Sequence, residues 1–185
     1  MPLSGSDWVG KFPTSVDLDD LAAPFRDNAK AFIAAMLAAG ASIKISATYR
    51  PRERAYLMYY AFRIAREGMD PTTVPPMKGV DIEWVHRDGK GKINIAASRN
   101  AAEDMVNGYD IVYRPALRSN HTRRLAVDMT ISWDGTLAVK NKRGSVVQIA
   151  GTPRSGLNHD LIVVGAGYGV LKLVSDPPHW SSDGH

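Results

Sequence analysis

The sequence predicts an α+β fold in a single domain spanning residues 1–185, with N-terminal helices packed on a small, mostly antiparallel sheet. Three observations predict it. Apolar residues recur at helical spacing in the first half, and they alternate with polar residues in the second half. No stretch of the chain has the composition of a linker, and 185 residues are within the range of one ordinary domain.

The chain begins with an irregular lead-in, because residues 1–16 are rich in Gly, Ser and Pro. A helix is expected from Leu21 to Ala39, with Pro24 in its first turn and Gly40 as its C-terminal stop. Its buried face would be formed by apolar residues three or four positions apart: Phe25, Ala29, Phe32, Ile33 and Met36.

Further elements follow in the first half. Ile43–Thr48 is predicted as a strand, and Pro51 lies in the first turn of a helix that runs to Arg66 before Gly68. Three prolines make residues 70–78 a loop, and a short helix is expected over Ala101–Val106.

The second half has the alternating pattern of short strands, with one more helix expected over Asn158–Gly165. A final strand, Val170–Val174, would be broken by the Asp-Pro-Pro sequence that begins at Asp176. The other predicted strands are Leu125–Ile131, Leu137–Val139 and Val146–Ile149.

Composition excludes several classes of site and partner. The chain has no cysteine, so any metal ligands must be His, Asp or Glu. The net charge is +4, but Lys and Arg are scattered, which argues against a nucleic-acid partner. No apolar run is long enough to cross a bilayer, and the N-terminus lacks the pattern of a signal peptide. We therefore expect synthesis in the cytoplasm and no membrane insertion.

One candidate metal-binding stretch surrounds Asp128. In the predicted strand, Asp128 points away from the apolar face, and the small Ala126 leaves room beside it. His121 lies seven residues earlier in a loop that can fold back over the same face. A carboxylate and an imidazole placed in this way could share a metal. The alternative is a solvated strand residue and an unrelated loop histidine.

A second candidate stretch contains Asp176 and His179, separated by two prolines. The prolines stiffen the turn and hold the carboxylate and the imidazole at a nearly fixed separation. The stretch could supply a third ligand and a general base, or it could be a surface turn with His179 packed on Trp180.

The two stretches together resemble the zinc peptidases that cut bacterial cell-wall peptides, namely the D-alanyl-D-alanine carboxypeptidases and dipeptidases and the L-alanyl-D-glutamate endopeptidases. The family pattern is Ser-x-His-x-x-Gly-x-Ala-x-Asp, then an acidic residue three before a His, with an earlier Tyr-Arg after a strand. The matching positions here are Tyr49, Arg50, Ser119, His121, Ala126, Asp128, Asp176 and His179.

The resemblance implies a role for each matching polar residue. Asp176 would be the general base, Arg50 would bind a substrate carboxylate or the developing oxyanion, and Ser119 would bind substrate or orient a ligand. The resemblance implies three zinc ligands: His121, Asp128 and His179.

Two positions depart from the family pattern. Arg124 stands where the family has Gly, so the loop would differ or Arg124 would point into the substrate groove. Asp176 stands where many members have the longer Glu. The remaining histidines have no expected role in the site: His86 and His159 are expected at the surface, and His185 is expected to be mobile.

The resemblance implies a zinc metallopeptidase that hydrolyses peptidoglycan stem peptides, best described as an endolysin-like L-alanyl-D-glutamate endopeptidase. A D-alanyl-D-alanine carboxypeptidase and a non-catalytic zinc-containing binding module remain as alternatives. The expected partner is the peptidoglycan peptide, reached after lysis or through another delivery system, and the expected oligomeric state is a monomer.

Overall fold

The computed structural model describes residues 1–185 and contains four α-helices and two antiparallel sheets. The chain divides into two compact units: unit 1 comprises residues 1–13 and 51–118, and unit 2 comprises residues 14–50 and 119–185. We expected a single domain over residues 1–185. The contacts fall into two units because the helices that follow Pro51 bury their apolar faces among themselves.

Unit 2 is built on a four-stranded antiparallel sheet with the order β1-β2-β6-β5. In chain order the strands are β1 (Ser42–Ala47), β2 (Ala126–Ser132), β5 (Leu171–Lys172) and β6 (His179–Ser181). The central strand β2 pairs with β1 over most of its length, but with β6 only over Ala126–Asp128. β6 therefore ends its pairing beside Asp128.

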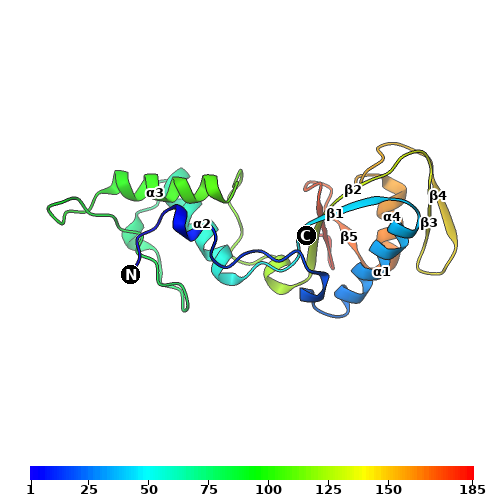
Figure 1. Cartoon of the computed structure of the whole chain (residues 1–185), viewed down its shortest axis with the longest axis horizontal. Coiled ribbons are helices and arrows are strands. Elements are labelled where there is room, and N and C mark those ends of the chain that lie inside the picture. Colours follow the sequence, from blue (N-terminus) through cyan, green and yellow to red (C-terminus); the bar gives the residue numbers. More distant parts are fainter. The chain divides into compact units, whose positions relative to one another are not determined.

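Two helices and a hairpin complete unit 2. The helices are α1 (Phe25–Ala38) and α4 (His159–Tyr168), which pack against each other, and the hairpin is formed by β3 (Leu137–Lys140) and β4 (Val146–Ile149). Figure 1 shows both helices beside the strands of this unit. They cover the apolar face of the sheet.

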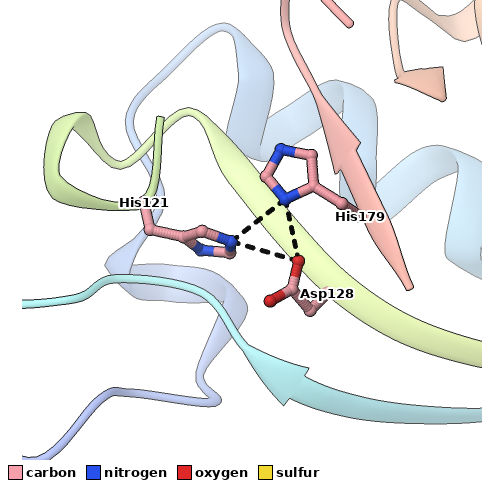
Figure 2. A group of neighbouring side chains, drawn as sticks. All are labelled: His121, Asp128 and His179. Atoms are coloured by element: carbon pink, nitrogen blue, oxygen red, sulfur yellow. Dashed lines mark hydrogen bonds and ion pairs between the residues drawn. The ribbon is translucent and has the colours of Figure 1, made fainter. Parts of the chain in front are cut away.

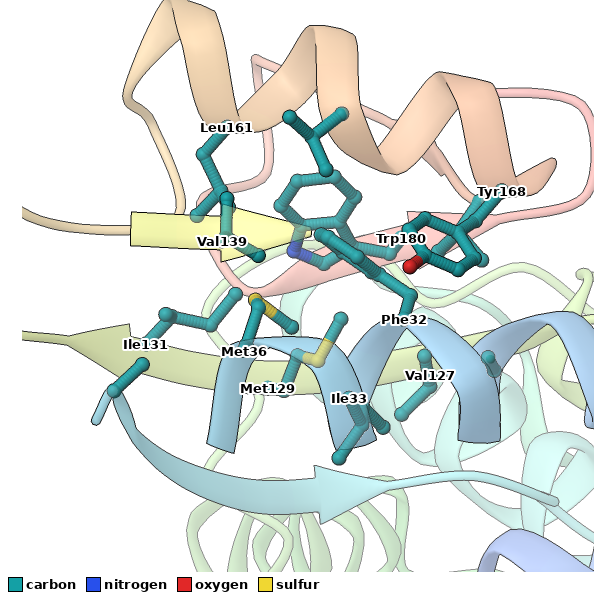
Figure 3. Close-up of a cluster of buried hydrophobic side chains, with 14 of the residues drawn as sticks. Phe32, Ile33, Met36, Val127, Met129, Ile131, Val139, Leu161, Tyr168 and Trp180 are labelled. Atoms are coloured by element: carbon teal, nitrogen blue, oxygen red, sulfur yellow. The ribbon is translucent and has the colours of Figure 1, made fainter. Parts of the chain in front are cut away.

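The core of unit 2 is centred on Trp180, which is fully buried. Its ring lies 5.4 Å from that of Phe32 of α1, between centroids, and Figure 3 shows both rings among the surrounding aliphatic side chains. Burying an aromatic side chain stabilises a core by a few kcal/mol. Because Trp180 follows His179 directly, this packing also fixes β6.

Unit 1 is a second hydrophobic cluster formed mainly by α2 (Arg52–Arg66) and α3 (Ile95–Gly108). Trp8 from the N-terminal segment is 3% exposed within this cluster, and its indole N–H donates to the carbonyl of Leu3 at 3.0 Å. The expectation of an irregular lead-in over residues 1–16 is therefore wrong in part, because Trp8 lies in a 3₁₀ turn (Ser6–Trp8) and supplies core.

The predicted elements are present with shifted ends. The helix expected from Leu21 begins at Phe25, after a 3₁₀ turn at Leu18–Asp20, and the short helix expected at Ala101–Val106 begins at Ile95, where the Asn94 side chain accepts from the amide of Ala97. The strand β6 was not predicted. None of the four α-helices is long and apolar enough to cross a lipid bilayer.

Candidate metal centre

Three side chains from separate segments of unit 2 converge on one point (Figure 2). Asp128 lies on β2, and His179 lies directly opposite it on β6 in the antiparallel register. His121 begins the 3₁₀ turn His121–Arg123 that leads into β2. The prediction that these three side chains come together is therefore confirmed.

The three ligand atoms form a nearly regular triangle. His121 Nε2 lies 3.1 Å from Asp128 Oδ1, His179 Nδ1 lies 3.0 Å from the same oxygen, and the two nitrogens are 3.2 Å apart. The imidazole planes are nearly perpendicular, at 76°. Each residue thus offers one atom to a shared point, and the group could hold a metal ion.

The outer nitrogen of each imidazole faces a main-chain oxygen. His121 Nδ1 lies 2.7 Å from the oxygen of Thr48, and His179 Nε2 lies 3.1 Å from the oxygen of His185. A main-chain oxygen can only accept a hydrogen bond, so these two nitrogens donate and carry the ring protons. The inner nitrogens of the neutral rings therefore present lone pairs toward each other and toward Asp128, which is an arrangement that a cation between them would stabilise.

The three side chains are largely shielded from solvent. The residues His121 and His179 are 4% and 6% exposed, and Asp128 is half-buried. Burial raises the pKa of the Asp128 carboxyl, but hydrogen bonds and charge interactions with the two imidazoles outweigh it and hold that pKa well below its usual range. Burial lowers the pKa of His179, but the bond to Asp128 and its charge leave it raised. The site favours bound positive charge.

The loop between His121 and β2 has an unusual backbone at Arg124. This residue lies in the left-handed region, with φ 65° and ψ 30°, which is the conformation that a Gly would adopt most easily. We expected either a loop that differs from the family or an Arg124 side chain in the substrate groove. Because Arg124 adopts the backbone conformation suited to Gly, the loop does not have to differ. Its guanidinium carbon lies 4.1 Å from the ring centroid of Tyr49, and its Nη1 donates to the carbonyl of Asp20 at 3.3 Å.

The residues expected to assist the ligands lie beside them. The amide of Arg50 donates to the carbonyl of His121 at 3.2 Å, so this half-buried arginine is tied to the ligand turn. Ser119 forms its hydrogen bonds within that turn: its Oγ accepts from the amide of Thr122 at 3.4 Å, and its carbonyl accepts from the Thr122 hydroxyl at 2.8 Å. Ser119 thus shapes the turn that carries His121.

Asp176 lies exposed on the turn that precedes β6. Its charge contributes to the raised pKa of His179, so the carboxylate acts on the ligand electrostatically. The ammonium group of Lys172 stabilises this turn: it donates to the carbonyls of Leu173 (2.7 Å), Asp176 (2.6 Å) and His179 (2.9 Å). All three ammonium donors are used.

Sequence reasoning missed Lys172 and the two main-chain acceptors at Thr48 and His185. A carbonyl leaves no signal in a sequence, because every residue has one. His185, which was expected to be mobile, contacts the site through its main chain: its oxygen accepts from His179 and its amide donates to Asp183, each at 3.1 Å. His159 is exposed at the start of α4, as expected.

Comparison of the chain with models of known protein families gave no match, and comparison with curated proteins gave none either. The residues of the site are therefore the basis on which a function can be inferred.

Proposed function

We propose that the protein is a zinc-dependent peptidase that hydrolyses peptidoglycan stem peptides. The observation that carries the proposal is the convergence of His121 Nε2, Asp128 Oδ1 and His179 Nδ1, with both imidazoles oriented by main-chain oxygens. Three protein ligands of this kind, which leave a coordination position open, are typical of catalytic zinc.

The donor set fits zinc in both chemistry and spacing. Ligand atoms around a tetrahedral zinc at about 2.0–2.1 Å lie roughly 3.3 Å from one another. The observed separations of 3.0, 3.1 and 3.2 Å are close to that value. Imidazole suits zinc better than it suits magnesium or calcium, which prefer sets of oxygen ligands.

A zinc ion held there would supply a Lewis acid that polarises a carbonyl and brings the pKa of water to about 7. Asp176, three residues before His179, is the general base in this proposal and takes the proton of the attacking water. The three bonds from Lys172 keep the main chain of this turn in place. The base and the ligand thereby keep a fixed relationship.

Arg50 would stabilise the negative charge that develops on the scissile carbonyl oxygen, or bind a substrate carboxylate. Its guanidinium is planar and always charged, and it can donate two parallel hydrogen bonds to such a group. The bond from its amide to the carbonyl of His121 ties its backbone to the ligand turn.

The substrate class rests on the resemblance of the ordered motifs to the cell-wall peptidases. Cleavage of the L-alanyl-D-glutamate bond is the first choice, in an enzyme made in the cytoplasm that reaches the wall after lysis or by another delivery system. Cleavage by a D-alanyl-D-alanine carboxypeptidase is the second. The new amino-terminal residue distinguishes them, since a carboxypeptidase releases free D-alanine.

The experiment is release of amino termini from purified peptidoglycan, with zinc or with a chelator. We expect zinc-dependent release by the wild type and none by His179→Ala. Asp176→Asn is expected to keep zinc bound but to lose turnover by about 100-fold or more. His159→Ala is the matched control, because the side chain of His159 is 89% exposed and belongs to the same unit.

Two outcomes would overturn parts of the proposal. Tight zinc binding without any release would favour a non-catalytic binding module. Full activity in Asp176→Asn would remove Asp176 from the role of base. Arg124, which stands where the family pattern has Gly, keeps the left-handed backbone of the loop.

A further inference from the structure

The outer nitrogen of His179 is held by a segment that no motif of the sequence singled out. Residues 182–185, here called the closing segment, follow β6 and turn back so that the main-chain oxygen of His185 lies 3.1 Å from His179 Nε2. This oxygen decides which nitrogen of His179 carries the proton. The position of the closing segment therefore decides whether Nδ1 has a free lone pair.

Asn120, which precedes the ligand His121, fixes this segment with both donors of its side-chain amide. Asn120 Nδ2 donates to Asp183 Oδ1 and to the main-chain oxygen of His185, each at 2.6 Å. Asn120 is 6% exposed. A buried amide that uses both of its donors on one segment leaves that segment little freedom.

Asp183 organises the closing segment from within. Its Oδ1 also accepts from the amide of His185 at 3.1 Å and from Ser181 Oγ at 3.3 Å, while Ser181 Oγ accepts from the amide of Gly184 at 2.9 Å. Ser181 is completely buried in β6. The carboxylate thus connects the strand of one ligand with the turn of another.

We propose that Asn120 and Asp183 are positioning residues of the metal centre, which hold the oxygen of His185 against His179 Nε2 and thereby keep His179 Nδ1 available to the metal. The inference rests on the metal-binding part of the proposed function. Partners of this kind, one bond beyond a ligand, set both the orientation and the basicity of the imidazole.

Loss of the hydrogen bonds that Asn120 and Asp183 make to the closing segment has a defined consequence. Without the oxygen of His185 in place, neutral His179 can move its proton to Nδ1 and donate to Asp128, whose Oδ1 lies 3.0 Å away. The inner nitrogen would then have no lone pair for a metal. Replacement of such outer partners typically weakens metal binding by about 10- to 100-fold.

The test uses the full chain and two measurements on each variant. The first is zinc affinity by competition with a chromogenic chelator. The second is the ¹⁵N chemical shifts of the His179 ring in the metal-free protein, at a pH where the ring is neutral. For Asn120→Ala and Asp183→Ala we expect affinity to fall about 10- to 100-fold and the two ring nitrogens to shift toward a tautomer mixture. Asp183→Asn keeps an acceptor oxygen and should recover part of both.

The matched control is Asn158→Ala. Asn158 is also buried, at 3% exposure, and its Nδ2 also donates to two main-chain oxygens, those of Gly151 and Pro153. Its loss removes these two bonds and the two that its Oδ1 accepts from the amides of Asp160 and Leu161, without touching the closing segment. We expect lower stability with unchanged zinc affinity and unchanged His179 shifts.

The outcomes separate the two proposals. If the wild type binds no zinc, the metal-binding proposal fails. The ring shifts of the metal-free variants still decide whether Asn120 and Asp183 position the His179 ring. The wild type binds zinc in the other case. If Asn120→Ala and Asp183→Asn then match it in affinity and in ring shifts, Asn120 and Asp183 have only a structural role and the inference is overturned. Should Asn120→Ala not fold, Asp183→Asn carries the test.

Discussion

The guanidinium of Arg124 stacks on the ring of Tyr49, with 4.1 Å between its central carbon and the ring centroid, while the backbone of Arg124 is left-handed at φ 65°. The two features oppose each other energetically. The left-handed angle costs a non-Gly residue roughly 1–2 kcal/mol, and an exposed cation–π contact returns roughly 0.5–1 kcal/mol. The residue at this position is therefore tolerated because its side chain offsets part of the strain of its backbone.

Arg124→Gly and Arg124→Ala separate these terms. Both variants lose the contact with Tyr49, but only Gly relieves the backbone, so we expect Gly to be more stable than Ala by about 1 kcal/mol. Urea unfolding of the two variants measures the difference. An Ala variant as stable as the Gly variant would show that the backbone angle carries no strain.

Lys172→Met tests the turn that carries Asp176 and His179. The variant keeps an apolar stem, but it removes the ammonium that bonds three main-chain oxygens. Because each of these oxygens loses one donor and keeps only a backbone amide, we expect the free energy of unfolding to fall by about 1–3 kcal/mol, with a parallel loss of zinc affinity. Lys44→Met, at an exposed position of β1, is the control for loss of a charge. Equal effects of the two substitutions would contradict the role of Lys172.

Zinc should stabilise unit 2 selectively. A ligand at 100 times its dissociation constant stabilises the folded state by about 2.7 kcal/mol. We therefore expect hydrogen exchange to slow by up to about 100-fold at amides of β2 and β6, such as those of Val127 and Trp180, which exchange by opening of this unit. Amides of α2 and α3, in unit 1, should not change. Uniform protection of both units, or none, would argue against a metal bound at the predicted ligands.

Unit 1 should lose stability at high pH because of Tyr109. Burial raises the pKa of Tyr109 to about 12, against a smaller opposing effect of Arg54, and its hydroxyl donates to the carbonyl of Trp8 at 3.1 Å. The folded-state pKa lies above the unfolded value of about 10, so this contribution is complete below about pH 10 and is lost as the pH rises toward 12.

Tyr109→Phe should make the fall in stability between about pH 10 and 12 less steep, because one proton fewer is released on unfolding. The urea midpoint, measured by circular dichroism across this range, gives the slope. Tyr113→Phe is the control, since Tyr113 is 84% exposed. A pH slope that does not change in Tyr109→Phe would refute the assignment.

The elements that could be predicted are those whose pattern is local. β2 alternates clearly, and the ligand types on it and before it pointed to a shared site. β6 was missed because it has three residues and follows two prolines, so it has no alternation of its own; its pairing with β2 makes it a strand.

Non-local pairing explains the other differences as well. Trp8 enters the core of unit 1 through contacts with α3, about a hundred residues away, and nothing near Trp8 in the sequence signals this burial. The boundary between the two units is hidden for the same reason. Both units are apolar inside, and the chain passes between them after Pro13, after Arg50 and after Arg118 without a linker composition.

Two glycines of α4 test how Trp180 is packed, with opposite expected signs. A Cβ at Gly165 would lie 2.8 Å from the Trp180 ring and 3.1 Å from that of Phe32, and both rings are fully buried and cannot move aside. Gly165→Ala should therefore lower the free energy of unfolding by about 1–3 kcal/mol. Gly167 has no neighbour within 4 Å of an added Cβ, so Gly167→Ala should raise it by about 0.4–1 kcal/mol. Urea unfolding of both variants decides, and a stabilising Gly165→Ala would mean that α4 does not press on the indole next to His179.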